Sequence, residues 1–256
     1  MTSFYNDVND WLSVGGDLDL AKDLTNQDHA TTIAQLRERS ITHVIDLRIE
    51  WEDKAKWVAG GLAPENYLHL PIDDRWGYVP PEDWYAGIFD FVQQFWLDSA
   101  EGDRLYVHCH MGVNRAPSAA MLALLAVDPL MHPMEAFLKI REARSVAGLV
   151  YAEAVGIWHL LNVENVTADD LAEAGELPAS VTLFSAAIDA YWTPEMVREV
   201  NRGIAYYRSA EGGTIKVGGQ STLACSADQT HRVKWNSGDP VCLDCGSPVR
   251  SVHAES

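Results

Sequence analysis

Two spacings of apolar residues follow one another along the first part of the chain. Three runs mix β-branched, aromatic and aliphatic side chains over about six positions, which is the length of a strand. They are 42–47, 67–72 and 104–109. Between them, residues 28–39 and the segment after Pro81 repeat apolar residues at spacings of three and four, as helices do. Strands that alternate with helices predict an α/β fold, with a mostly parallel central sheet flanked by helices.

The pattern changes after the third predicted strand. Residues 116–127 and 134–144 predict two further helices, and the segment from Thr167 to about Arg208 is helical without any strand spacing. Thr167 with Asp170 is typical of a capping box. A glycine-rich stretch follows, and then three of the four cysteines. We therefore divide the chain into a first domain at 1–164, a helical extension at 165–214 and a C-terminal segment at 215–256.

Charge and composition restrict the classes of partner that we expect. The chain has 37 acidic and 19 basic residues among 256, a net charge of -18, which repels nucleic acid and anionic lipid. The longest unbroken apolar run, Ala119 to Val127, has nine residues and is too short to cross a bilayer. We expect no nucleic-acid or membrane partner and a cytoplasmic location, where cysteines stay reduced.

The strongest chemical signal is the run from His108 to Ser118. Cys109 ends a predicted strand, Arg115 follows with five residues between them, and an apolar helix starts at once. A loop between a strand and a helix directs backbone N–H groups at one point, which favours a bound anion and lowers the pKa of a thiol there. Arg115 can bind two phosphate oxygens. This arrangement predicts a nucleophilic thiolate, populated at neutral pH, inside a phosphate-binding loop.

These residues resemble the HCxxGxxR signature of the cysteine-dependent protein tyrosine phosphatase superfamily. The flanking chain is similar to the dual-specificity branch of that superfamily. The similar segments are Trp11–Gly16, Ile41–Leu47, Leu70–Asp74 and Arg141–Arg144. The resemblance covers roughly residues 8 to 163 and implies a dual-specificity phosphatase-like catalytic domain at 1–164.

The resemblance also implies roles for individual residues. Cys109 would attack phosphorus, Arg115 would hold the phosphate oxygens, and His108 would help to set the thiolate. The loop amides would line the phosphate site. Those residues are His110, Met111, Gly112, Val113, Asn114 and Arg115.

Two positions depart from the family pattern. Ala116 stands where the family usually has Ser or Thr, so Ser118 becomes a candidate substitute hydroxyl and slow turnover becomes an alternative. Asn114 resembles the HCxxGxNR pattern of cysteine-based RNA 5′-triphosphatases, and Arg-Ala-Pro resembles glucan phosphatases.

A second chemical group is needed because the leaving oxygen of a phosphate ester needs a proton donor. Asp73 and Asp74 follow the second predicted strand and precede a proline-marked helix. Matching Pro-Ile-x-Asp to the general-acid loop of the family selects Asp74 as the acid. Asp73 remains the alternative.

The C-terminal segment carries a candidate metal site. Cys225, His231, Cys242 and Cys245 supply three thiols and an imidazole. Cys-x2-Cys before a glycine suits a knuckle for tetrahedral Zn²⁺. The first spacing is longer than usual, so His253 or water is an alternative fourth ligand. We expect a small zinc ribbon with a structural zinc ion that takes no part in the chemistry of Cys109.

Together these features predict a phosphatase that needs no cofactor for catalysis. It would hydrolyse phosphomonoesters through a phosphocysteine intermediate. The expected partner is a phosphorylated protein, with phosphotyrosine, phosphoserine or phosphothreonine, or a small phosphomonoester. One alternative is a catalytically weak phosphate-binding or adaptor module, suggested by Ala116. Another is an RNA 5′-phosphatase, suggested by Asn114 and opposed by the net charge of -18.

Overall fold

A computed structural model of the chain describes residues 3–74 and 78–210, and four short strands between 222 and 252. The chain forms two compact units, Met1–Gly212 and Gly213–Ser256. The helical extension therefore belongs to the same compact unit as the sheet that precedes it.

The first unit is built on a five-stranded sheet, and four neighbouring strands in it are parallel. In spatial order the strands are β1 (Tyr5–Asp7), β2 (Leu12–Gly15), β5 (Arg104–His108), β3 (Ile41–Asp46) and β4 (Tyr67–His69). Only β1 runs antiparallel to its neighbour, which confirms the predicted mostly parallel α/β sheet. β4 is shorter than the predicted strand 67–72 and ends two residues before Pro71, whose nitrogen cannot donate a ladder hydrogen bond.

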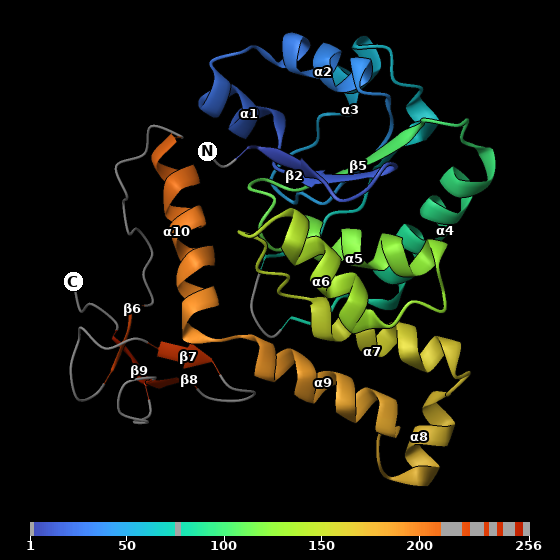
Figure 1. Cartoon of the computed structure of the whole chain (residues 1–256), viewed down its shortest axis with the longest axis vertical. Coiled ribbons are helices and arrows are strands. Elements are labelled where there is room, and N and C mark those ends of the chain that lie inside the picture. Colours follow the sequence, from blue (N-terminus) through green and yellow to red (C-terminus); the bar gives the residue numbers. More distant parts are fainter. Residues whose placement is uncertain are drawn as a thin grey trace. The chain divides into compact units, whose positions relative to one another are not determined.

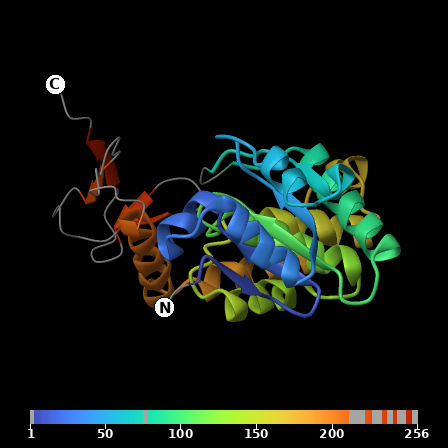
Figure 2. The same ribbon diagram turned by 90° about the horizontal axis from the view of Figure 1, so that it is seen from above.

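One face of the sheet is covered by three short helices (Figures 1 and 2). They are α1 (Leu18–Thr25), α2 (His29–Glu38) and α3 (Lys54–Ala59). Leu18, Ile33 and Trp57 of these helices pack with Val44 and Tyr106 of the sheet in one buried cluster. The predicted helix 28–39 is confirmed as α2, with Asp28 as its N-cap.

The larger core lies on the opposite face, where four helices cover the sheet. They are α4 (Glu82–Asp98), α5 (Arg115–Val127), α6 (Pro133–Ala143) and α7 (Ala152–Val163). α5 contacts the sheet on one side and α4, α6 and α7 on the others, so its residues from 115 to 126 are all buried. This position explains why α5 is apolar all round.

The extension is helical, as predicted, and its described residues form three helices. They are α8 (Ala168–Ala174), α9 (Ala179–Tyr191) and α10 (Pro194–Ala210). Thr167 and Asp170 form the predicted capping box at α8. Val181 and Phe184 of α9 are fully buried in the larger core, and Phe184 lies so close to Gly156 of α7 that any side chain there would collide with it.

The second unit holds two antiparallel strand pairs. β6 (Thr222–Cys225) pairs with β9 (Val249–Val252), and β7 (Val233–Trp235) pairs with β8 (Pro240–Cys242). Two of the predicted zinc ligands, Cys225 and Cys242, are the last residues of β6 and β8. The other candidates, His231, Cys245 and His253, lie outside the described residues. Within the described ranges no group of His, Cys, Asp or Glu side chains forms a metal site.

Candidate active site

The predicted phosphate-binding loop joins β5 to α5. β5 ends at His108 and α5 begins at Arg115, so Cys109 lies where the strand gives way to the loop. The backbone N–H groups of Gly112 and Ala116 donate to its sulfur. Gly112 has φ +66°, and a Cβ there would lie 2.2 Å from the backbone of Gly15, so only glycine fits.

The outer side of the loop is tied down through its carbonyl groups. Arg144, which is buried just after α6, donates from Nε to the Gly112 carbonyl at 2.7 Å and from Nη2 to the Met111 carbonyl at 3.0 Å. The N–H of Gly148 donates to the Val113 carbonyl at 2.6 Å. A peptide plane directs its carbonyl and the following N–H to opposite sides, so holding the Met111 carbonyl on the outside keeps the amide of Gly112 directed at Cys109.

Arg115 is buried between two carboxylates. Its Nη1 and Nη2 donate to Oε2 and Oε1 of Glu50 at 2.9 and 3.0 Å, a bidentate pair. Its Nε lies 3.6 Å from Oδ2 of Asp74. The sequence analysis did not single out Glu50, which follows β3 and lies 65 positions before Arg115. A bidentate pair of this kind holds the guanidinium in one orientation beside the loop.

Asp74 is the aspartate of the predicted pair whose carboxylate meets the loop. Its Oδ1 accepts a hydrogen bond from Nδ2 of Asn114 at 3.1 Å. Burial raises the pKa of Asp74, and Arg115 and Asn114 act against that rise. The main-chain carbonyl of Asp73 accepts from the hydroxyl of Tyr151, which anchors the backbone beside Asp74. A carboxyl group with a raised pKa is suited to donate a proton.

The thiol of Cys109 differs from the sequence prediction in one respect. Burial raises the pKa of Cys109 above its ordinary value. Arg115 and the amides of Ala116 and Gly112 lower it, while Asp74 adds to the rise. The raised pKa opposes the thiolate expected at neutral pH, and burial is its main cause.

The side chains of His108, His110 and Ser118 lie near Cys109 in sequence, and the fold determines what each of them contacts. Both ring nitrogens of buried His108 are without a hydrogen-bond partner among the described residues. Nδ1 of His110 lies 2.9 Å from Oδ2 of Asp17, the N-cap residue of α1. Ser118 donates its hydroxyl proton to the Asn114 carbonyl at 2.9 Å, so this proton is not directed at Cys109.

A buried ion-pair cluster lies beside the loop at the end of β3. Arg48, fully buried, donates to Asp46 at 2.6 and 2.8 Å and to Asp17 at 3.1 Å, and lies 2.9 Å from Asp53. Asp17 also binds His110 of the loop. No local sequence pattern predicts this cluster, because Asp17 is about thirty positions away from its other members.

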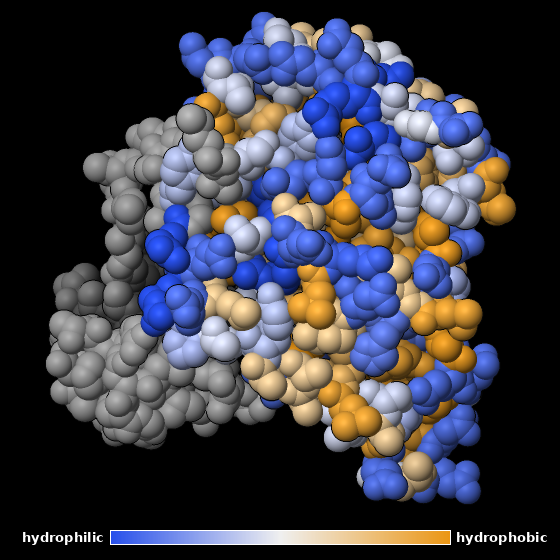
Figure 3. All heavy atoms as spheres, in the orientation of Figure 1, coloured by the Kyte–Doolittle hydropathy of each residue, from blue (hydrophilic) through white to orange (hydrophobic). Residues whose placement is uncertain are grey.

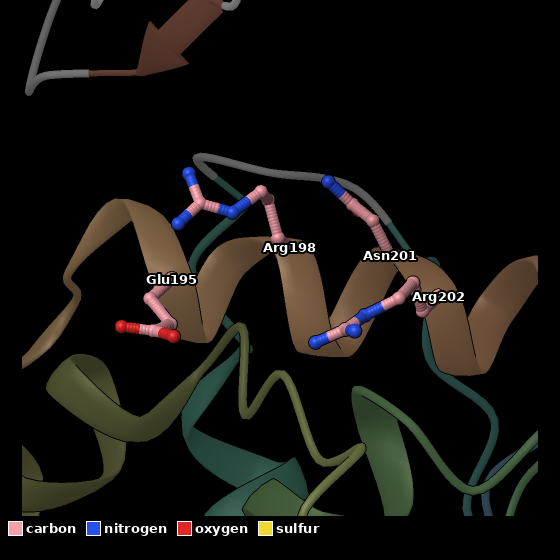
Figure 4. Close-up of a pocket in the computed structure, with 4 residues that line it drawn as sticks. All are labelled: Glu195, Arg198, Asn201 and Arg202. Carbon is pink, nitrogen blue, oxygen red and sulfur yellow. The ribbon is translucent and has the colours of Figure 1, made fainter.

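Other surfaces of the first unit lie away from these residues. Exposed apolar side chains gather over α6, α7 and α9, among them Leu138, Val163 and Leu183 (Figure 3). A shallow pocket runs along α10, and its described lining residues are Glu195, Arg198, Asn201 and Arg202 (Figure 4). Among the described helices, none has the length and apolar composition needed to span a membrane.

Comparisons with known proteins give matches to solved structures alone. No family model matches the chain, and no curated protein matches it. PTPMT1 in complex with PI(5)P is 18% identical with a TM-score of 0.49, over 64% of this chain and 100% of its own. Tk-PTP in the active form is 18% identical with a TM-score of 0.47, over 65% and 100% of the two chains.

Human DUSP28 is 17% identical with a TM-score of 0.46, over 64% of this chain and 95% of its own. The names of these proteins belong to the tyrosine and dual-specificity phosphatases, the superfamily that the sequence motif resembles. At identities and TM-scores this low the likeness assigns no activity to this chain.

Proposed function

We propose that the chain is a phosphatase that hydrolyses phosphomonoesters through a phosphocysteine intermediate. One observation carries the proposal: Cys109, two inward-directed amides, Arg115 and Asp74 converge at the junction of β5 and α5. A nucleophile, an anion-binding cradle and a proton donor are the three groups that this reaction requires.

In the first step Cys109 loses its thiol proton to solvent, its thiolate attacks phosphorus, and the bond between phosphorus and the ester oxygen breaks. Asp74 gives its proton to the leaving oxygen. Its raised pKa supports this role, because the carboxyl group keeps its proton to a higher pH than an aspartate with the ordinary pKa. The loop amides and Arg115 stabilise the charge on the phosphoryl oxygens.

In the second step a water molecule attacks the phosphorus of phosphocysteine. The carboxylate of Asp74 now takes a proton from that water, the sulfur–phosphorus bond breaks, and the thiolate of Cys109 forms again. Phosphate leaves, and Asp74 is protonated as it was at the start. The same carboxyl group thus acts as acid and then as base.

Glu50 has to share Arg115 with the substrate. The bidentate pair uses one Nη1 and one Nη2 proton, and Nη1 also contacts the carbonyls of Leu47 and Ile72 at 3.5 Å. Nε and the second Nη2 proton are therefore left for phosphoryl oxygens. Glu50 holds the guanidinium group of Arg115 in place and offsets part of the positive charge of that group. This balance supports binding of a dianionic phosphate group and its release after hydrolysis.

The proposed substrate is a phosphorylated protein side chain, with small phosphomonoesters as the alternative. Ile49 and Trp51 flank Glu50 and are 61% and 42% exposed. The Trp51 ring meets that of His110 edge-on at 5.6 Å between centroids, which places an apolar surface beside the loop. Such a surface can contact the aryl ring of a phosphotyrosine. A panel of phosphotyrosine, phosphoserine and phosphothreonine peptides tests this.

The decisive experiment for the mechanism compares the parent with Cys109→Ser and Cys109→Ala. We expect both variants to fold and to lose turnover on an aryl phosphate. Rapid quenching of the parent in acid should trap one phosphoryl group, which peptide mass spectrometry should locate on Cys109. Turnover of Cys109→Ser within tenfold of the parent would remove the covalent mechanism.

A phosphate-binding module with weak turnover is the second candidate. Ala116 offers Cys109 only its backbone N–H, and the hydroxyl proton of Ser118 is given to Asn114. Phosphocysteine breakdown would then lack the hydroxyl that the family pattern supplies. Release of one equivalent of the leaving group followed by a slow phase would favour this candidate, and Ala116→Ser should accelerate the slow phase.

A further inference from the structure

The last helix of the extension packs against the phosphate-binding loop. Val200 and Tyr207 of α10 share a buried cluster with Val113 of the loop, and Met111 packs against the same cluster. Tyr207 is fully buried. The helical extension is therefore in direct contact with the loop that carries Cys109, although Tyr207 lies almost a hundred positions after it in sequence.

Arg144 connects α10 to the backbone of the loop through hydrogen bonds. A guanidinium group has five N–H donors. Nε and one Nη2 proton hold the carbonyls of Gly112 and Met111. The Nη1 protons bind Oδ1 of Asn6 at 2.7 Å and the Ser3 carbonyl at 3.2 Å. The other Nη2 proton binds Oη of Tyr207 at 2.8 Å, so every donor has a partner.

Tyr207 is in turn fixed at both its oxygen and its ring. Its hydroxyl donates to the Ser3 carbonyl at 3.0 Å while accepting from Arg144. The guanidinium carbon of Arg144 lies 5.4 Å from the centre of the Tyr207 ring. Arg144 is thus clamped between the N-terminal segment, the loop and α10, and it cannot shift without breaking several buried hydrogen bonds.

We propose that Tyr207 is a positioning residue for the phosphate-binding loop, which makes α10 a working part of the active site. It acts through Arg144, whose bonds to the Met111 and Gly112 carbonyls keep the loop amides directed at Cys109. The inference deepens the proposed function and rests on it for the catalytic readouts. Its structural part, the effect of Tyr207 on the ionisation of Cys109, does not require turnover.

The variant Tyr207→Phe keeps the ring and removes the hydroxyl. One Nη2 proton of Arg144 and the Ser3 carbonyl then lose a partner in a buried place. We expect Arg144 to relax towards Ser3 and to loosen its hold on the loop carbonyls. The amide of Gly112, which shares a peptide with the Met111 carbonyl, would then contact the sulfur less well, and the pKa of Cys109 should rise further.

Tyr191→Phe is the matched control. Tyr191 also belongs to the extension, and its hydroxyl accepts from Nε of a second α6 arginine, Arg141, at 3.3 Å. Arg141 donates to the carbonyls of Ser145 and Ala147, which lie outside the loop. The two variants therefore remove the same atom from the same kind of pair, and only one of the pairs reaches the loop.

Three measurements on the full chain test the proposal. The rate of iodoacetamide alkylation of Cys109 against pH, located by peptide mass spectrometry, should move to higher pH in Tyr207→Phe. Inhibition by inorganic phosphate should weaken, and kcat should fall about tenfold, because small misplacement of a catalytic group costs up to roughly a hundredfold. Tyr191→Phe should match the parent in all three.

Equal alkylation profiles for Tyr207→Phe and the parent would overturn the proposal. So would a Tyr207→Phe chain that has lost cooperative unfolding in urea, because the role of the hydroxyl would then be global stability. If Cys109→Ser keeps its turnover, the proposed function fails, but the alkylation profile still decides the role of Tyr207. The failures of the two proposals are thus separable.

Discussion

At the scale of single residues, the guanidinium group of Arg115 interacts with three acidic groups. Arg115 pairs with Glu50, lies near Asp74 and lowers the pKa of Cys109. Because its positive charge is shared, burial prevails at both neighbouring acids, and the pKa values of Asp74 and Cys109 are raised. The raised pKa suits Asp74 as a proton donor. It makes Cys109 dependent on Arg115 and on the loop amides for its ionisation.

This dependence predicts different results for two substitutions of Arg115. Arg115→Ala removes a charge that lowers the pKa of Cys109, so the pKa should rise, and each pH unit of rise leaves about tenfold less thiolate at neutral pH. Arg115→Lys keeps the positive charge but loses the planar guanidinium group that can bind two oxygens. Alkylation of Cys109 should therefore stay near the parent rate, while inhibition by phosphate should weaken. Alkylation of Arg115→Ala at the parent rate would contradict this.

The general acid is tested by substituting each of the two aspartates. Asp74→Asn should cost roughly 10²- to 10⁴-fold on an alkyl phosphate, whose leaving oxygen needs a proton, and much less on an activated aryl phosphate. The fall in kcat/KM at rising pH that reports loss of the Asp74 proton should disappear. Asp73→Asn is the matched control and should lack the leaving-group dependence. The reverse pattern would assign the proton donor to Asp73.

At the scale of elements, local patterns predicted what local interactions determine. The strands that became β3 and β5, the helix α5 and the cap of α8 follow from spacing and capping residues within a few positions. The strand–loop–helix context was enough to place Cys109 and Arg115 together. Glu50 and Tyr207 were missed because they reach the loop only through the folded chain, across long separations in sequence.

The ion-pair cluster at the end of β3 shows how the fold supports this loop. Burial acts to raise the pKa of Asp46, but the neighbouring His108 and hydrogen bonds from Arg48 and Tyr67 hold it well below its usual range. A carboxyl whose pKa is depressed by folding stabilises the protein above its unfolded pKa of about 3.9, and that stability is lost as the pH falls. The cluster is therefore a stabilising element at neutral pH.

Arg48→Met tests the cluster because it leaves Asp17, Asp46 and Asp53 without their shared cation. We expect a loss of about 3–5 kcal/mol in the free energy of unfolding at pH 7, as when one partner of a buried pair is removed. The unpaired carboxyls would then have raised pKa values, so the deficit should shrink at pH 5. Urea unfolding at both pH values measures it. A deficit below about 1 kcal/mol at pH 7, as for an exposed pair, would show that the cluster is not needed.

At the scale of the whole molecule, the chain joins one compact unit with the candidate active site to a second with two short strand pairs. Both are part of an acidic protein, with a net charge of -18. The extension belongs to the first unit by its packing, since α9 enters the larger core and α10 contacts the loop. The sequence pattern predicted that this segment is helical but not that α10 contacts the phosphate-binding loop, because that contact depends on buried side chains from distant segments.

The second unit carries the last prediction, a structural zinc ion. A segment this small lacks the apolar core that would hold it folded, so four ligands around one metal ion would supply the missing stability. The proposed ligands are Cys225, His231, Cys242 and Cys245, of which Cys225 and Cys242 end strands.

Elemental analysis of the full chain should find about one zinc per chain. Cys242→Ser should lose it, whereas Cys109→Ser should keep it. Chelation should leave the phosphatase rate unchanged because the proposed mechanism uses only Cys109, Arg115 and Asp74. A chain purified without metal, or a rate that falls in step with the zinc content, would refute the assignment.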